Sequence, residues 1–207
     1  VCALAPTDAW AAGVDGAVLR WDGSAWRPVP SGTRTPVRAL ACPATDDVWA
    51  AGTEGMLLHW DGAGWTRLPT GTWSGLGNLI AFRSDDVWAA AYDGLLLHWD
   101  GRQWRDAGAG IREGISGFWG PAPDDLWAVG ENGAALHFDG TSWTRTAGGM
   151  TGVLRSVFGL ATDDIWAAGG RGALLHWDGV AWSVERLPGG VSASCVWGAS
   201  SAELWAF

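Results

Sequence analysis

All four histidines of the chain occupy one position of a repeated pattern and are spaced 39 residues apart: His59, His98, His137 and His176. Imidazoles in such an array could form a ring of metal ligands or general bases. One ion bonds its ligands at ~2 Å, however, whereas packed sheets lie about 10 Å apart. We therefore expect each histidine to be hydrogen-bonded inside its own sheet, for example to Asp47 and its equivalents.

Pairs of adjacent aspartates recur at the same interval: Asp46-Asp47, Asp85-Asp86, Asp124-Asp125 and Asp163-Asp164. Paired carboxylates could bind calcium or perform acid–base catalysis. Adjacent residues of a strand point to opposite faces, which suits a shared site poorly, and no D-x-D-x-D-G calcium loop occurs. We expect these aspartates to stabilise turns by accepting hydrogen bonds from backbone N–H groups.

These side chains must be positioned by a repeat that runs through the whole chain without insertion or deletion. Its anchors are Trp10, Trp49, Trp88, Trp127, Trp166 and Trp205. With 207 residues, of which 48 % are hydrophobic, the chain can bury a sizeable core. We therefore interpret residues 1–207 as a single repeat domain.

Each period contains four apolar runs of strand length, which in one repeat are Val48–Gly52, Met56–Asp61, Trp65–Leu68 and Leu76–Phe82. Tight hairpin signals separate the runs. Asp15-Gly16, Asp93-Gly94 and Asn132-Gly133 are preferred in type I′ turns, in which both residues need a positive φ. The pattern predicts four-stranded antiparallel sheets.

The third run is apolar on both faces, which indicates a sheet covered on both sides. The inner strand carries the small residues Ala39, Gly117 and Ser156, which fit a crowded position near an axis. We therefore predict an all-β fold, a β-propeller of four-stranded blades; a β-solenoid is the competing architecture.

Five blades are favoured, and a fragment of a six- to eight-bladed propeller is the alternative. Five-bladed closure requires Ser192–Gly198 to supply the inner strand of the first blade, so that Glu203–Phe207 is either surplus or competes with Ala9–Gly13. A closed ring would be a monomer, whereas an open one would expose edges that pair with another chain.

Several motifs resemble known propeller families. Leu58-His59-Trp60-Asp61 resembles the Trp-Asp ending of WD40 repeats, and the D-G-x-x-W hairpin resembles the Asp-box of sialidase-like propellers. V-W-A-A-G resembles the repeats of photosystem-assembly propellers. In blade number and aromatic richness the chain is similar to tachylectin-like five-bladed lectins, a resemblance that implies glycan binding.

Candidate ligand-binding residues fall into two groups. In-register tryptophans just past the second hairpin could serve as sugar platforms: Trp65, Trp104, Trp143 and Trp182. The second group breaks the repeat, on the face where connections vary: Trp73, Tyr92, Asp93 and Arg112. Trp73 and Tyr92, with Asp93 nearby, could stack on a sugar ring or anchor a peptide. We expect the invariant turns to serve folding and the variable connections to serve function.

Composition narrows the partners. The net charge of −9 argues against nucleic acid and anionic membranes, and no apolar run reaches the ~18 residues of a membrane span. The odd cysteine count favours free buried thiols at Cys2, Cys42 and Cys195, although one pair could form a disulfide.

The sequence has no G-x-S-x-G or H-E-x-x-H motif and no phosphate loop. We therefore expect a non-catalytic binding module without metal or cofactor, most concretely a lectin-like propeller, extracellular or on the cell surface. A protein-interaction scaffold and a structural segment of a larger secreted protein are the alternatives.

Overall fold

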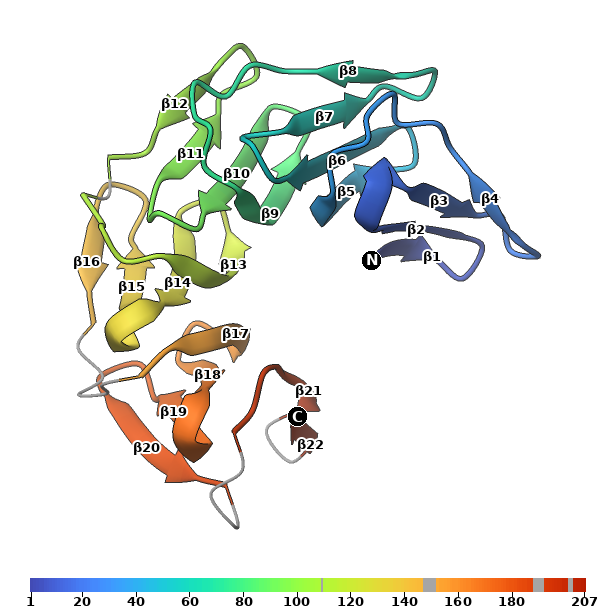
Figure 1. Cartoon of the computed structure of the whole chain (residues 1–207). Helices are drawn as coiled ribbons and strands as arrows, with labels where there is room; N and C mark the ends of the chain where they lie inside the picture. The colour runs from blue at the N-terminus through green and yellow to red at the C-terminus, as the bar shows by residue number, and fades with distance from the viewer. Residues whose placement is uncertain (109, 147–151, 188–191, 201–202) are drawn as a thin grey trace. The chain divides into compact units, whose positions relative to one another are not determined.

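The computed structural model describes residues 1–108, 110–146, 152–187, 192–200 and 203–207. The chain forms two compact units, Val1–Gly110 and Ile111–Phe207. Each unit consists of antiparallel sheets in which strands consecutive in sequence are neighbours (Figure 1). The predicted four-stranded meander is therefore confirmed.

The first unit holds three four-stranded sheets. The first sheet comprises β1 (Cys2–Ala5), β2 (Asp8–Ala12), β3 (Val18–Trp21) and β4 (Trp26–Pro28), with the short 3₁₀ turn η1 (Val14–Gly16). The second comprises β5 (Val37–Ala44), β6 (Asp47–Gly52), β7 (Leu57–Trp60) and β8 (Trp65–Arg67). The third comprises β9 (Leu76–Arg83), β10 (Asp86–Ala91), β11 (Leu96–Trp99) and β12 (Trp104–Asp106).

The second unit continues the pattern. The fourth sheet comprises β13 (Ile115–Ala122), β14 (Asp125–Gly130), β15 (Ala135–Phe138) and β16 (Trp143–Arg145), with η2 (Glu131–Gly133). The fifth comprises β17 (Leu154–Ala161), β18 (Asp164–Gly169), β19 (Ala173–Trp177) and β20 (Trp182–Arg186), with η3 (Gly170–Gly172). A two-stranded sheet follows, of β21 (Val196–Ser200) and β22 (Glu203–Ala206).

The inner strand of each sheet comes from the stretch after the previous outer strand. The run Leu76–Phe82 thus belongs to the third sheet, where it pairs with β10. Val37 to Ala44 does the same in the second sheet. Each 39-residue period that starts at the tryptophan anchor therefore straddles two sheets.

The expected closure of the first sheet by Ser192–Gly198 is wrong. Cys2–Ala5 supplies the inner strand of the first sheet, and Val196 pairs with Ala206 in a sheet of its own. Glu203–Ala206 is not surplus, because it forms the second strand of that sheet. A further sheet beyond five is what the alternative of six to eight blades predicts.

The turns between second and third strands follow the hairpin prediction in two of the three named cases. Asp15-Gly16 and Asn132-Gly133 have positive φ at both residues, and so does Glu54-Gly55. At Asp93-Gly94 only the glycine does. In the other four-stranded sheets a glycine precedes this turn, whereas the third sheet has Ala91 at that position. At the equivalent Gly52 of the second sheet a Cβ would collide with the carbonyl of Pro36. The alanine of the third sheet is therefore accompanied by a turn of different conformation.

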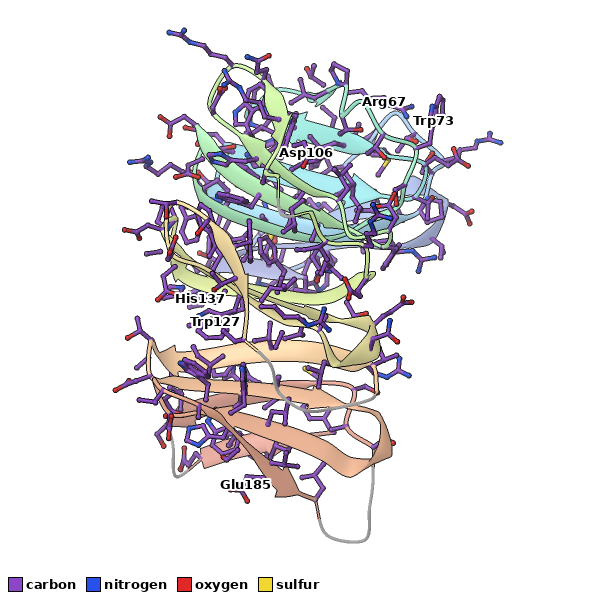
Figure 2. The ribbon with its side chains drawn as sticks, turned by 90° about the vertical axis from the view of Figure 1, so that its left-hand side faces the viewer. Arg67, Trp73, Asp106, Trp127, His137 and Glu185 are labelled. Atoms are coloured by element: carbon purple, nitrogen blue, oxygen red, sulfur yellow. A yellow bond between two sulfur atoms is a disulfide. The ribbon has the colours of Figure 1, made fainter. Side chains whose placement is uncertain are left out.

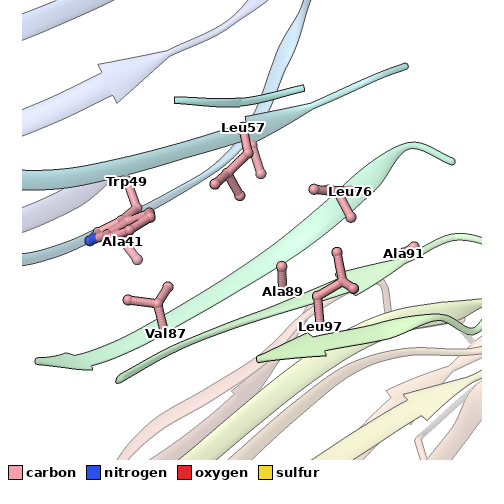
Figure 3. Packing of buried hydrophobic residues seen from close by; sticks show 9 residues of the cluster. Ala41, Trp49, Leu57, Leu76, Val87, Ala89, Ala91 and Leu97 are labelled. Atoms are coloured by element: carbon pink, nitrogen blue, oxygen red, sulfur yellow. The ribbon is translucent and has the colours of Figure 1, made fainter. Parts of the chain in front are cut away.

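Tryptophans seal neighbouring sheets within each unit. The second-strand indole of Trp49 is 1 % exposed and lies against Trp99 and Trp104 of the next sheet, at centroid distances of 5.7 and 5.8 Å. Trp10 packs likewise on Trp60 and Trp65, and Trp127 on Trp177 and Trp182. Figure 3 shows Trp49 and Leu57 facing the buried residues of the third sheet. The predicted packing between sheets is confirmed.

Cys2 and Cys42 form a disulfide that joins the inner strands of the first two sheets, with a Cα–Cα distance of 6.2 Å. The preference for free thiols is therefore wrong for this pair, and correct for Cys195. Sequence spacing gave no hint of the bond, because only the packing of β1 beside β5 brings the two thiols together.

We predict that Trp49→Ala lowers the free energy of unfolding by about 3–5 kcal/mol, because the cavity left between the sheets cannot collapse. Trp73→Ala, at a side chain 84 % exposed, is the matched control and should change it by less than about 0.5 kcal/mol. Urea denaturation followed by circular dichroism measures both. Equal midpoints for wild type and Trp49→Ala would contradict the packing role.

A second prediction concerns the disulfide. The intact mass of the denatured, unreduced protein should rise by about 2 Da on reduction, since two S–H bonds replace the S–S bond. The double variant Cys2→Ser/Cys42→Ser should lose about 2–4 kcal/mol of stability. Cys195→Ser is the control and should keep the reduction-dependent mass shift. Alkylation of all three cysteines without reductant would refute the bond.

Candidate functional site

The repeated histidines and aspartates form one structural unit per sheet. In the second sheet, His59 Nε2 lies 2.8 Å from Asp47 Oδ1, and the imidazole stacks on Trp49 at 4.2 Å. His98–Asp86, His137–Asp125 and His176–Asp164 repeat the pair at 2.8 to 2.9 Å. Figure 2 labels His137 beside Trp127, on which it stacks. The predicted hydrogen bonding within each sheet is confirmed.

In the third, fourth and fifth sheets the carboxylate also accepts a second bond, from the tryptophan of the same unit. The indole N–H of Trp88 donates to Asp86 Oδ1 at 3.2 Å, and Trp127 and Trp166 donate to their aspartates in the same way. A buried carboxylate is costly unless its oxygens are hydrogen-bonded. The histidine and the tryptophan therefore hold the aspartate, and the aspartate fixes both rings.

The first sheet builds the same unit without histidine. Arg20 Nε and Nη2 donate to the two carboxylate oxygens of Asp8 at 3.0 and 3.1 Å, and the guanidinium lies 5.2 Å from the Trp10 ring centroid. A planar cation that stacks on the indole and binds the carboxylate thus replaces imidazole. This substitution supports a structural role for the whole series.

The adjacent aspartates have separate tasks. Asp47 binds His59. Asp46 lies against the turn between the third and the outer strand, where a Cβ at Gly62 would sit 2.9 Å from Asp46 Cβ. Among the described residues, no cluster of three or more histidines, cysteines or acids is arranged to hold a metal ion. Nor does any helix in the described part of the chain have the length and apolarity to span a membrane.

An aspartate stabilises the turn between the third and the outer strand of each four-stranded sheet. Asp61 Oδ1 accepts hydrogen bonds from the N–H groups of Ala63 and Gly64, and Asp139 accepts them from Thr141 and Ser142. The hydroxyl of Thr141, followed by the N–H groups of Ser142 and Thr141, lowers the pKa of Asp139 from 3.8 to about 2. The pKa of Asp61 is lowered as well, chiefly by the N–H of Gly64.

The opposite ends of the strands carry two kinds of loop. One is the turn between the second and third strands of a sheet, and the other is the connection from the outer strand to the inner strand of the next sheet. In the second sheet the N–H of Gly55 donates to Ser74 O at 3.0 Å, and the hydroxyl of Thr70 donates to Gly55 O at 2.9 Å. The turn and the connection are therefore in contact, as expected for a shared variable face.

A pocket of about 270 Å³ opens on this face, lined by Glu54, Gly55 and Arg67–Trp73. Trp73 is 84 % exposed; Figure 2 labels it together with Arg67. An equivalent pocket of about 610 Å³ lies in the first sheet, lined in part by Gly16 and Pro28–Arg34. Both connections read P-[ST]-G-T, at Pro30–Thr33 and Pro69–Thr72.

Tyr92 lies next to this pocket. A Cβ at Gly77 would sit 2.6 Å from its Cε1, and a Cβ at Gly75 would sit 3.0 Å from its Cδ2 and 3.7 Å from the Cα of Thr53. The ring therefore rests on two glycines of the connection and inner strand, beside the turn of the second sheet. Tyr92 remains 50 % exposed.

We call the surface formed by Glu54, Arg67, Trp73, Tyr92 and Asp93 the aromatic patch. It belongs wholly to the first unit. It combines two large exposed aromatic rings with one guanidinium and two carboxylates, which is chemistry suited to stacking and hydrogen bonding.

Comparison with known proteins supplies the fold and no family. No family model matches the chain, and no curated protein matches its sequence. YCF48 from Cyanidioschyzon merolae is similar over 97 % of this chain and 75 % of that chain, with a TM-score of 0.75 and 16 % identity. This chain is a β-propeller repeat protein.

Two further propellers agree. The propeller domain of Swd1 from Myceliophteria thermophila matches 97 % of this chain and 76 % of its own, with a TM-score of 0.73 and 12 % identity. YCF48 bound to a D1 peptide matches 87 % and 78 %, with a TM-score of 0.58 and 15 % identity. The four-stranded sheets are therefore the blades of this propeller.

The blades separate the predicted site residues into two sets. Trp65, Trp104 and Trp182 lie between blades, each against the anchoring tryptophan of the preceding one. Trp143 contacts Phe138 at 5.3 Å. Their packing gives all four a role in stability, and their use as sugar platforms stays a prediction.

Trp73 lines the pocket on the variable face of the propeller, and Tyr92 and Asp93 lie in the turn of the third blade on the same face. Asp93 Oδ1 also accepts a hydrogen bond from the N–H of Leu95 at 3.2 Å. Arg112 is exposed and belongs to the second unit, where its N–H donates to Glu113 Oε2. Binding of a ligand by any of them stays a prediction.

Glu54, Arg67 and Gly77 were not among the site residues predicted from the sequence. A signal for Gly77 existed, because its equivalents in other repeats are Arg38, Ser116 and Arg155. The larger side chains are replaced by glycine in the blade that carries Tyr92. The repeated P-[ST]-G-T motif was also visible, and it frames the pocket that Arg67 lines.

The blade turns generate a prediction about pH. Because the pKa of Asp139 is lowered on folding, its stabilising effect is present above pH 3.8 and is lost as the pH falls through about 2. Asp139→Asn should therefore show a smaller drop of the urea midpoint between pH 5 and pH 2 than wild type. Ser142→Ala keeps its N–H and should behave like wild type. Parallel curves for wild type and Asp139→Asn would disprove the role.

Proposed function

We propose that this propeller is a non-catalytic binding module that holds an extended segment of a partner protein on the aromatic patch. The observation that carries the proposal is Trp73, a tryptophan 84 % exposed at the rim of a pocket. Trp and Tyr dominate the energetics of protein interfaces because they bury much area at little entropic cost.

The shape of the patch supports a segment of chain as the ligand. The pocket of about 270 Å³ opens at the surface between a turn and a connection, and Tyr92 extends the surface toward the third blade. A small-molecule site would be more enclosed, burying most of its ligand. Peptide binding by the neighbour YCF48, solved with a D1 peptide, further supports the proposal.

Glycan binding of a lectin-like kind is the second candidate. It is favoured by the juxtaposition of the Trp73 indole with Glu54 and Arg67 in one pocket, because a ring face with charged groups beside it can stack on a sugar and bind its hydroxyls. Repeated weak sites on several blades would add avidity.

The absence of catalysis is part of the proposal. Its support is that each histidine is held between a carboxylate and an indole, so that its ring nitrogen and its face serve the blade. We place the protein outside the cell or at its surface. The disulfide Cys2–Cys42 supports this location, because such bonds persist in oxidising compartments.

Substitution of the two aromatics tests the function. Trp73→Ala and Tyr92→Ala should each weaken binding of a protein segment selected from a displayed random peptide library at least about 10-fold, as hot-spot residues do. Isothermal calorimetry measures the affinity. Trp26→Ala, a half-exposed tryptophan after a turn on the invariant face, is the control and should bind normally.

A glycan array with the same variants distinguishes the second candidate. Glycan binding lost with Trp73→Ala, without any selected peptide, would replace the first proposal by the lectin. Selected peptides that bind both aromatic variants as tightly as wild type would overturn the site itself.

A further inference from the structure

The indole, the phenol and the guanidinium of the aromatic patch are all hydrogen-bond donors. Within the part of the chain that the structure describes, the indole N–H of Trp73, the hydroxyl of Tyr92 and the guanidinium of Arg67 make no hydrogen bond or ion pair. On the protein segment proposed above, the acceptors that match three free donors are backbone carbonyl oxygens that are not already bonded.

The chain limits how far the glycines under the Tyr92 ring can lie from the Trp73 backbone. Trp73 precedes Gly75 by two residues, and Tyr92 rests on Gly75 and Gly77. An extended chain spans at most ~3.5 Å per residue, so Gly75, the nearer of the two glycines, lies within ~7 Å of the Trp73 backbone. A polyproline II helix repeats every three residues, or ~9 Å.

Carboxylates border the patch in a row. Asp15, Glu54 and Asp93 occupy the same turn position in three successive blades of the first unit, and all three are exposed. In the described residues none of them lies within ion-pairing distance of an arginine. With a net charge of −9 on the chain, the row favours a basic residue in the ligand.

The location of the patch argues against a ligand that adds a strand. Trp73 lies in a connection and Tyr92 in a turn, at the ends of the strands, whereas an added strand needs the free edge of β8 or β12. Recognition there must come from side chains that stack on the ligand and donate to its carbonyls.

We infer that the aromatic patch binds a proline-rich segment in the polyproline II conformation, flanked by a basic residue. This inference rests on the function proposed above and names its ligand. Proline rings stack on aromatic faces, proline has no N–H to satisfy, and its free carbonyls accept from the Trp73, Tyr92 and Arg67 donors. The flanking cation faces the Glu54 and Asp93 carboxylates.

The packing of Tyr92 on Gly77 is the feature that distinguishes this blade from the others. Arginine or serine at the position of Gly77 in other blades would displace the ring, since even a Cβ would sit 2.6 Å from it. The third blade therefore has both the tyrosine and the glycine that lets the ring lie flat, which is the orientation that stacking needs.

Fluorescence anisotropy of the full chain with three labelled synthetic peptides tests the inference. The first contains two P-x-x-P turns and a flanking arginine, the second has alanine for every proline, and the third has glutamate for the arginine. We expect the second to bind at least about 10-fold more weakly and the third about 3- to 10-fold more weakly, with the gap to the first narrowing in high salt.

Variants of the protein assign the effect to the patch. Tyr92→Phe keeps the ring and should weaken the first peptide by about 3- to 10-fold through the lost hydroxyl, while Trp73→Ala should weaken it further. Gly77→Ala should weaken binding although both aromatics remain. Circular dichroism confirms that each variant is folded, and Trp26→Ala is again the control.

The outcomes separate this inference from the proposed function. If the alanine-substituted peptide binds as well as the proline peptide, or library peptides that depend on Trp73 lack proline, the inference is wrong and the binding module stands. If no peptide depends on Trp73 or Tyr92, both are wrong.

Discussion

The packing of one indole between two sheets is the interaction on which the rest of this propeller depends. The second-strand tryptophan is fixed on its own blade by a stacked histidine or arginine and, in three blades, by a hydrogen bond to a buried or half-buried aspartate. Within each unit its other contacts are the two tryptophans at the next hairpin. Each indole thus contributes a large buried apolar area and also sets the register between blades.

The same unit explains why the potential chemistry of the sequence is used for structure. A histidine, an aspartate and a tryptophan at constant spacing resemble catalytic machinery when listed by type. In the fold, His59 Nε2 binds Asp47, the ring stacks on Trp49, and the carboxylate is 12 % exposed. The first blade has Arg20 in place of histidine, which preserves the geometry and would abolish general-base chemistry.

The ligand site that we propose lies on the face where the repeat is broken. On the invariant face, turns touch each other through Asp46 and Gly62, and any change would disturb both. On the variable face, the connection packs on the turn through Thr70 and Gly55, while Trp73 is free to project. The turns that stabilise the blades and the proposed ligand site therefore lie at opposite ends of the same strands.

Sequence patterns alone were sufficient to predict the strands, most of the hairpins, the pairing of histidine with aspartate, and the place of Trp73 and Tyr92 where the repeat is broken. They were sufficient because hydrophobic period, turn chemistry and constant spacing are local properties. The contact of Cys2 with Cys42 and the packing of Tyr92 on Gly77 beside the Arg67 pocket became visible only in the folded chain. These contacts join residues from different strands or blades, and their formation depends on how sheets pack, which no local pattern encodes.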